Sequence, residues 1–301
     1  MVSPAPSATS RAALAGIGLM LAGIFMFAVN DAMGKWLVAT YKVGQVLLIR
    51  SIAALGVLAP FIWRDRATFR TVPRPGMQAL RAFFATTEVA CFYWAVTVLP
   101  LADVMTYYLA GPIFVTVIAG TVLREPVGWR RWTAVFTGFC GVVVALRPGT
   151  ATLSWPALVA LIGSFTFSLS MISTRFLRGT SDTVLVTTQT VAALVFGIVA
   201  APIGWVTPSP RDFVLLCLLG IVAMASHVCV NRSLILAPAS VVVPYQYTTI
   251  VWAVLFGYLV FGDVPDVWML TGAAIIVGAG LFIFLRERTL VRRESFSEPP
   301  P

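Results

Sequence analysis

Apolar runs of roughly 20 residues recur from one end of this chain to the other, with short polar stretches between them. A run of this length crosses the ~30 Å hydrocarbon core of a bilayer as an α-helix. Of the 301 residues, 59% are hydrophobic and 11% are charged, whereas a soluble domain carries charges on about a quarter of its residues. The chain is therefore expected to use lipid as its solvent.

The runs predict an all-α integral membrane fold with ten transmembrane helices. The expected spans are residues 13–37, 44–63, 77–98, 101–122, 129–147, 155–176, 183–203, 212–235, 239–261 and 267–286. Membrane strands are excluded because the runs are too long and do not alternate with a period of two. No residues remain to form a separate soluble domain.

Basic residues are distributed unevenly between the two sides of the predicted bundle. With a cytoplasmic N-terminus, 15 of the 21 fall inside, namely Arg11, Arg64, Arg66, Arg70, Arg74, Arg81, Arg124, Arg130, Arg131, Arg175, Arg178, Arg286, Arg288, Arg292 and Arg293. Only 4 fall outside, namely Lys35, Lys42, Arg147 and Arg211. Because basic loops favour the cytoplasm, we expect both termini there.

The two halves of the chain repeat one another at a shift of 138 to 140 residues. At 138 the matches are Pro100, Val104, Tyr107, Val122 and Thr133 with Pro238, Val242, Tyr245, Val260 and Thr271; at 140 they are Phe25, Phe27 and Leu37 with Phe165, Phe167 and Leu177. We expect a cytoplasmic segment at 1–12, five-helix repeats at 13–150 and 151–287, and a disordered cytoplasmic tail at 288–301. Five spans is an odd number, so the second repeat is inverted, as is common in secondary transporters.

At these residues the sequence resembles the EamA branch of the drug/metabolite transporter superfamily. The first copy has Leu99-Pro100-Leu101-Ala102, Pro112, Arg124-Glu125-Pro126, Trp129, Trp132 and Gly138-x-x-Gly141; the second has Ala237-Pro238-Ala239, Asp263, Gly278 and Gly280. Asp263 stands where the family usually has Glu. Glu125 and Asp263 lie at span ends, and we interpret both as structural.

The resemblance implies ten helices, a place in a bacterial inner (plasma) membrane, and transport of small organic solutes by alternating access without ATP. Family members include exporters of amino acids, among them aromatic ones, and this is the first substrate expectation. The segment Asn30–Lys35 resembles a branch that takes up S-adenosylmethionine, which is the alternative. A passive channel and a membrane enzyme are the remaining classes.

Other functional classes lack their motifs. The net charge of +9 does not indicate nucleic-acid binding, because the arginines lie between apolar runs and not on one basic face. His227 is the only histidine, all four cysteines fall in apolar runs, and no GxxxxGK[ST] or GxSxG motif occurs. We therefore expect no catalytic residue, no metal and no cofactor.

Ionisable residues inside the spans are the main candidates for contacts with the solute, because charge in lipid is costly. They are Asp31, Arg50, Glu88 and His227. Glu88 lies deepest, where a carboxylate binds a substrate ammonium or carries a coupling proton; the sequence does not choose between these. The alternatives without a site role are an Asp31–Lys35 pair, an Arg50 that snorkels to the outer surface or caps carbonyls, and a His227 packed in the core.

Polar aromatic residues and one amide complete the candidate set. Trp94, Tyr107 and Tyr245 lie near mid-span, and Gln246 places a neutral amide in the membrane. Tyr107 and Tyr245 are related by the repeat. Such side chains suit a solute with an aromatic or apolar body, although interfacial belts and packing use the same residues.

Small residues spaced by four suggest close helix packing. The pairs are Ala134/Gly138, Gly141/Ala145 and Ala274/Gly278. They suit either the interior of the bundle or the face of a homodimer. The expected partners are thus a small-molecule substrate and the lipid bilayer. If the small residues form a homodimer face, a second copy of the chain is also a partner.

Overall fold

The computed structural model describes residues 8–70, 72–121, 129–146, 154–177, 179–237, 242–262, 264, 267–268, 270–275, 277–279 and 282. Glu125, Arg147, Asp263 and the tail 288–301 lie outside these residues, so the predictions made for them stay predictions.

Within the described ranges the secondary structure is helical and contains no strand. The elements are α1 (Ala8–Val38), α2 (Val43–Arg64), α3 (Arg66–Arg70), α4 (Pro75–Val98), α5 (Leu101–Tyr108), α6 (Gly111–Thr121), α7 (Trp129–Leu146), α8 (Trp155–Phe176), α9 (Asp182–Ala200), α10 (Pro210–Leu236), a 3₁₀ segment η1 (Val243–Thr248), α12 (Thr249–Phe256) and a π-helical segment η2 (Gly257–Phe261).

Five helices are long and apolar enough to cross a membrane. They are Ala12–Val38, Val43–Arg64, Trp155–Thr174, Asp182–Ala200 and Pro210–Leu236, and shorter apolar helices cover Thr249–Phe261 and Leu270–Ala279. The protein is thus a multi-pass membrane protein. The count of ten spans stays a prediction.

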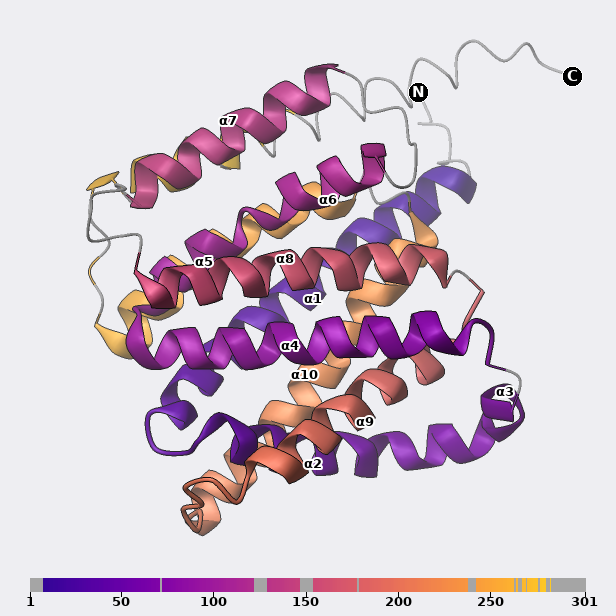
Figure 1. The fold of residues 1–301 in the computed structure, drawn as a ribbon. Helices are drawn as coiled ribbons and strands as arrows, with labels where there is room; N and C mark the ends of the chain where they lie inside the picture. Colours follow the sequence, from indigo (N-terminus) through magenta and orange to yellow (C-terminus); the bar gives the residue numbers. More distant parts are fainter. Residues whose placement is uncertain are drawn as a thin grey trace, which may run out of the picture.

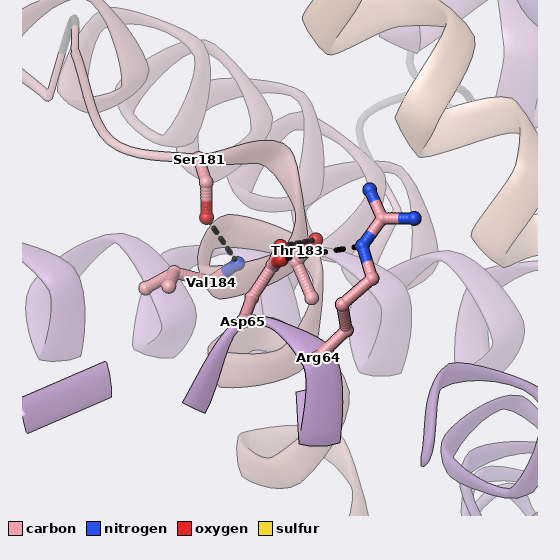
Figure 2. A network of polar contacts seen from close by, with 5 residues as sticks. All are labelled: Arg64, Asp65, Ser181, Thr183 and Val184. Atoms are coloured by element: carbon pink, nitrogen blue, oxygen red, sulfur yellow. Dashed lines mark hydrogen bonds and ion pairs between the residues drawn. The ribbon is translucent and has the colours of Figure 1, made fainter. Parts of the chain in front are cut away.

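Local sequence fixes where several of these helices begin. Ser181 caps α9, its hydroxyl accepting a hydrogen bond from the Val184 N–H at 3.3 Å, and Ser209 caps α10 in the same way. Beside the first cap, Thr183 donates to the Asp65 carboxylate at 2.8 Å and so joins the end of α2 to the start of α9 (Figure 2). Caps satisfy N–H groups that have no partner in the helix.

The predicted span 101–122 is interrupted, and this is a difference from the sequence expectation. α5 ends at Tyr108, a turn covers Leu109–Ala110, and α6 begins at Gly111 with Pro112 in its second position. Proline lacks the N–H that would continue the helical ladder, but it fits the first turn of a new helix. The repeat-related span likewise starts as 3₁₀ in η1 before becoming α-helical at Thr249.

The helices pack in pairs that correspond when the two halves are exchanged. α1 packs on α10 and α4 packs on α8, and Figure 1 shows α4 and α8 lying alongside one another. At a finer scale, an added Cβ on Gly23 would lie 3.2 Å from Cys229 Cβ, and one on Gly163 would lie 3.2 Å from Cys91 Cβ. Gly23 and Gly163 differ by 140 positions, and Cys91 and Cys229 differ by 138. The Gly23–Cys229 and Gly163–Cys91 contacts are therefore equivalent under the repeat.

The second helix of each half packs against its counterpart, α2 against α9. Their backbones touch at glycines: a Cβ on Gly44 would lie 2.5 Å from the Ala200 carbonyl carbon, and one on Gly197 would lie 2.6 Å from the Leu48 nitrogen. The start of α2 thus meets the end of α9, while Asp65 at the end of α2 meets Thr183 at the start of α9. The two equivalent helices run antiparallel.

Candidate solute-binding site

A cavity in the interior of the bundle collects polar and aromatic side chains from both halves. It is lined by Ile24, Phe27, Asn30, Asp31, Arg50, Glu88, Val89, Phe92, Tyr93, Met105, Tyr108, Leu109, Phe167, His227, Gln246 and Thr249. These residues come from α1, α2, α4, α5, α8, α10, η1 and α12, and from the turn after α5. The cavity therefore lies where the two halves meet and where the interrupted spans leave regular α-helix.

Two carboxyl groups and one guanidinium share this cavity, and all three of these ionisable groups come from the first half. Asp31 lies on α1, Arg50 on α2 and Glu88 on α4. Charged groups inside a membrane protein are costly unless they pair or bind a polar partner, so the cavity suits a solute that itself carries charge.

The Arg50 guanidinium is held by a chain of hydrogen bonds. Its Nη1 donates to the Tyr93 hydroxyl at 2.8 Å, and that hydroxyl donates to Asn30 Oδ1 at 3.2 Å. Asn30 Nδ2 in turn donates to the Leu219 carbonyl at 2.7 Å. The snorkelling interpretation of Arg50 is wrong, because only 9% of this residue is exposed.

The rest of the wall is aromatic with a few neutral polar groups. Tyr108 donates to the Glu88 backbone carbonyl at 3.1 Å, and Phe27 meets the His227 ring edge-on at 4.8 Å between centroids. His227 Nε2 lies 2.8 Å from Gln189 Nε2, and Gln246 Nε2 lies 3.4 Å from Met171 Sδ. Rings of this kind bind flat or apolar solute bodies.

Five of the eight predicted site residues line the cavity: Asp31, Arg50, Glu88, His227 and Gln246. The other three lie elsewhere. Tyr107 belongs to the main hydrophobic core beside Val104, Tyr245 packs in the cluster around Met20, and Trp94 is 37% exposed at the surface of the bundle. None of these three rings lines the cavity, and their role in binding the solute stays a prediction.

The sequence expectation missed Asn30, Tyr93 and Tyr108, which all line the cavity. One signal was present in the repeat: Tyr108 and Gln246 differ by 138 positions, and Phe27 and Phe167 by 140. Both members of each pair line the cavity, as expected for a site on the pseudo-symmetry axis.

Arg81 is one of the basic residues that the sequence predicts on the cytoplasmic side. It lies within α4, near the start of the helix, and is 2% exposed. Its Nε donates to Thr174 Oγ1 at 2.7 Å and its Nη1 to the Leu185 carbonyl at 3.0 Å. Arg81 thereby ties α4 to α8 and α9. Arg232, in contrast, forms an ion pair with Asp182 and is more than half exposed.

A smaller side pocket adjoins the cavity between α2, α4, α9 and α10. Arg50, Val89 and His227 line both spaces. Gln189 and Thr86 line the side pocket, and their Oε1 and Oγ1 atoms are buried without a hydrogen-bond partner. Unsatisfied buried polar atoms are costly, so these two atoms are available to a donor that enters the side pocket.

The two carboxyl groups and the guanidinium of the cavity have no ionisable equivalents in the second half. At the repeat shifts of 140, 139 and 138, Asp31, Arg50 and Glu88 correspond to Met171, Gln189 and Ser226. The first half therefore contributes the charged groups, and the second half contributes neutral ones at the equivalent positions. A solute with a charged head and an apolar body would bind in one orientation.

Together these features define a class: a multi-pass helical membrane protein with a buried, charged cavity between two related halves. The profile of the EamA-like transporter family matches residues 14–147 and again residues 154–285. The chain belongs to the EamA-like transporter family, and it is a membrane transporter of small metabolites and not an enzyme.

Named relatives align over nearly their whole length. An S-adenosylmethionine uptake transporter of Rickettsia felis is 27% identical over 95% of this chain and 97% of its own. A riboflavin transporter of Vibrio cholerae is 28% identical, covering 93% and 96%, and a pseudopaline exporter of Pseudomonas aeruginosa is 25% identical, covering 88% and 94%. A solved crystal structure matches the fold with a TM-score of 0.66 at 16% identity, covering 93% of this chain and 99% of that one.

Proposed function

We propose that this protein carries a solute with an amino-acid head and a planar aromatic body across a bacterial inner membrane, and that S-adenosylmethionine is this solute. The observation that carries the proposal is the cavity, which sets two carboxylates and one guanidinium against aromatic walls. Transport proceeds by alternating access, without ATP.

The charges of the cavity and of this solute are complementary. S-adenosylmethionine bears a carboxylate, an ammonium and a sulfonium. Arg50 pairs with the carboxylate, and Asp31 and Glu88 face the two cationic centres. Guanidinium–carboxylate contacts are strong and directional, while Phe27, Phe92 and Phe167 offer ring faces and edges to the adenine.

The competing solutes use less of this cavity. An aromatic amino acid has a carboxylate and an ammonium but no second cation, so one cavity carboxylate would be left without a counter-charge unless it is protonated. Riboflavin has a neutral ring system and no ammonium. The relatives named for S-adenosylmethionine uptake, which align over most of this chain, support the same choice and support uptake as the direction.

We further propose ten helices in two inverted five-helix repeats, with both termini cytoplasmic. The antiparallel packing of α2 and α9 supports this architecture, because equivalent helices run antiparallel only if one repeat is inverted. Inverted-repeat carriers bind their solutes near the midplane at the repeat interface, beside interrupted helices. The cavity beside Tyr108 and Gln246 lies between the two halves and next to interrupted helices, which supports this architecture.

Uptake into liposomes tests the substrate. Purified protein is reconstituted, and uptake of labelled S-adenosylmethionine is measured with excess unlabelled S-adenosylmethionine, tryptophan or riboflavin as competitors. We expect competition by S-adenosylmethionine above the others, and a loss of uptake in Asp31→Asn. Asp212→Asn is the matched control, because Asp212 lies outside the cavity and accepts a hydrogen bond from Tyr41. No saturable uptake of S-adenosylmethionine, or tighter competition by tryptophan than by S-adenosylmethionine itself, would refute the proposed substrate.

A further inference from the structure

We propose that Tyr93 is a positioning residue, which aims the Arg50 guanidinium at the carboxylate of the solute and so determines the preference for carboxylate-bearing solutes. This inference rests on the proposed function, since it assigns the carboxylate of the solute to Arg50. Tyr93 acts by orienting Arg50 and does not itself bind the carboxylate of the solute.

The contact between the two residues is close and buried. Arg50 Nη1 lies 2.8 Å from the Tyr93 hydroxyl, and the Arg50 Cζ atom lies 5.5 Å from the centre of the Tyr93 ring. A guanidinium has five N–H donors in a rigid plane. One donor fixed by Tyr93 therefore limits the directions in which the remaining donors can point.

Tyr93 is itself immobilised, so it can serve as a fixed support. It is 1% exposed, and its hydroxyl donates to Asn30 Oδ1 at 3.2 Å. Gly34 provides the room for the ring, because a Cβ at Gly34 would lie 2.3 Å from Tyr93 Cε1. Asn30 and Gly34 are four residues apart and share one face of α1. This face accepts the hydrogen bond of the Tyr93 hydroxyl at Asn30 and leaves room for the Tyr93 ring at Gly34.

Arg50 also has an alternative place to go. It lines the side pocket as well as the cavity, and there Gln189 Oε1 and Thr86 Oγ1 lack partners. A guanidinium released from the Tyr93 hydroxyl would gain an acceptor by turning toward Gln189. The hydrogen bond to the Tyr93 hydroxyl thus keeps the Arg50 guanidinium directed toward the cavity and not toward the side pocket.

The test compares solutes that differ only in the carboxylate. Binding is measured on purified full-length protein with S-adenosylmethionine against its decarboxylated form, and with tryptophan against tryptamine. In wild-type protein the carboxylate-bearing member of the pair should bind more tightly. In Tyr93→Phe that preference should fall about tenfold, the effect of one hydrogen bond to a charged group, while the affinity for the decarboxylated member stays unchanged.

Two further variants separate positioning from general damage. Tyr41→Phe removes a hydroxyl that donates to Asp212 at 2.7 Å outside the cavity, so the preference should stay at the wild-type value. Gly34→Ala drives a methyl group into the Tyr93 ring and should lower the preference as Tyr93→Phe does. Thermal unfolding of each variant shows whether it is folded.

Every outcome decides the inference. An unchanged preference in Tyr93→Phe overturns it, as does an equal loss of affinity for both members of a pair. A wild-type protein without any preference for the carboxylate also overturns it. If only the tryptophan pair binds, the proposed substrate fails while the role of Tyr93 is judged on that pair. If neither pair binds, both proposals are overturned.

Discussion

Replacing Gly220 by alanine should force α10 away from α2. A Cβ at Gly220 would lie 1.9 Å from the Arg50 carbonyl oxygen, 2.6 Å from its carbonyl carbon and 2.8 Å from its Cα. Contacts between carbon atoms are favourable at about 3.5–4.0 Å, so the helices must separate by roughly 1.5 Å. The obstructing atoms are backbone atoms within a helix, which cannot turn aside as a flexible side chain can.

The expected cost follows from overpacking. Added atoms in a packed interior cost about 1–3 kcal/mol, and the gain from replacing glycine by alanine within a helix offsets about 1 kcal/mol of that. Three backbone contacts shorter than 3 Å place this substitution at the upper end of that range, so we expect a net loss near 2 kcal/mol, or about 5 °C in Tm for a chain of this size. Solute affinity should fall as well, since the backbone that moves belongs to Arg50.

Thermal unfolding in detergent measures this effect, with Gly56→Ala as the matched control. Gly56 lies in α2 with nothing within 4 Å of its added Cβ, so this variant should keep the wild-type Tm or gain slightly. Equal Tm values for Gly220→Ala and Gly56→Ala would show that α2 and α10 do not approach as described, and the reasoning would fail.

Three other predictions concern the site, a helix cap and the topology. Glu88→Gln keeps shape and removes charge, so uptake should fall at least tenfold in a folded protein; normal uptake with normal pH dependence would remove Glu88 from the site. Ser181→Ala deletes the cap on Val184 N–H and should cost about 1 kcal/mol of stability with solute affinity intact, whereas a loss of affinity would contradict a purely structural cap. In a cysteine-free background, an impermeant reagent applied to intact cells should label a cysteine at position 42 and not one at position 70, and the reverse pattern would overturn the orientation.

Much of the helical framework could be predicted from hydropathy alone. The predicted span 155–176 coincides with α8, and 212–235 lies within α10 (Pro210–Leu236). The interruption between α5 and α6 was not predicted, because an apolar turn such as Leu109–Ala110 has the same hydropathy as a helix. Pro112 was the available signal, and it needed a backbone argument that a count of apolar residues does not contain.

The site was also predictable only in part: its ionisable residues could be identified from the sequence, and its tyrosines could not. Asp31, Arg50 and Glu88 could be identified because lipid makes an ionisable residue costly wherever it does not face the protein interior. Tyrosine has no such penalty, and neighbouring residues of a helix point about 100° apart. Tyr107 and Tyr108 are therefore equally plausible from sequence, yet Tyr108 lines the cavity and Tyr107 lies in the core.

Counterflow tests the central claim, that this protein is a carrier with a site for S-adenosylmethionine between its two halves. Liposomes containing the purified protein are loaded with unlabelled S-adenosylmethionine and diluted into a trace of the labelled compound. A carrier returns from the inner side occupied, so the label should rise transiently above its equilibrium level and then decline. A label that enters only to equilibrium, at the same rate in loaded and empty vesicles, would indicate a passive channel, and no entry beyond protein-free vesicles would contradict the proposed substrate.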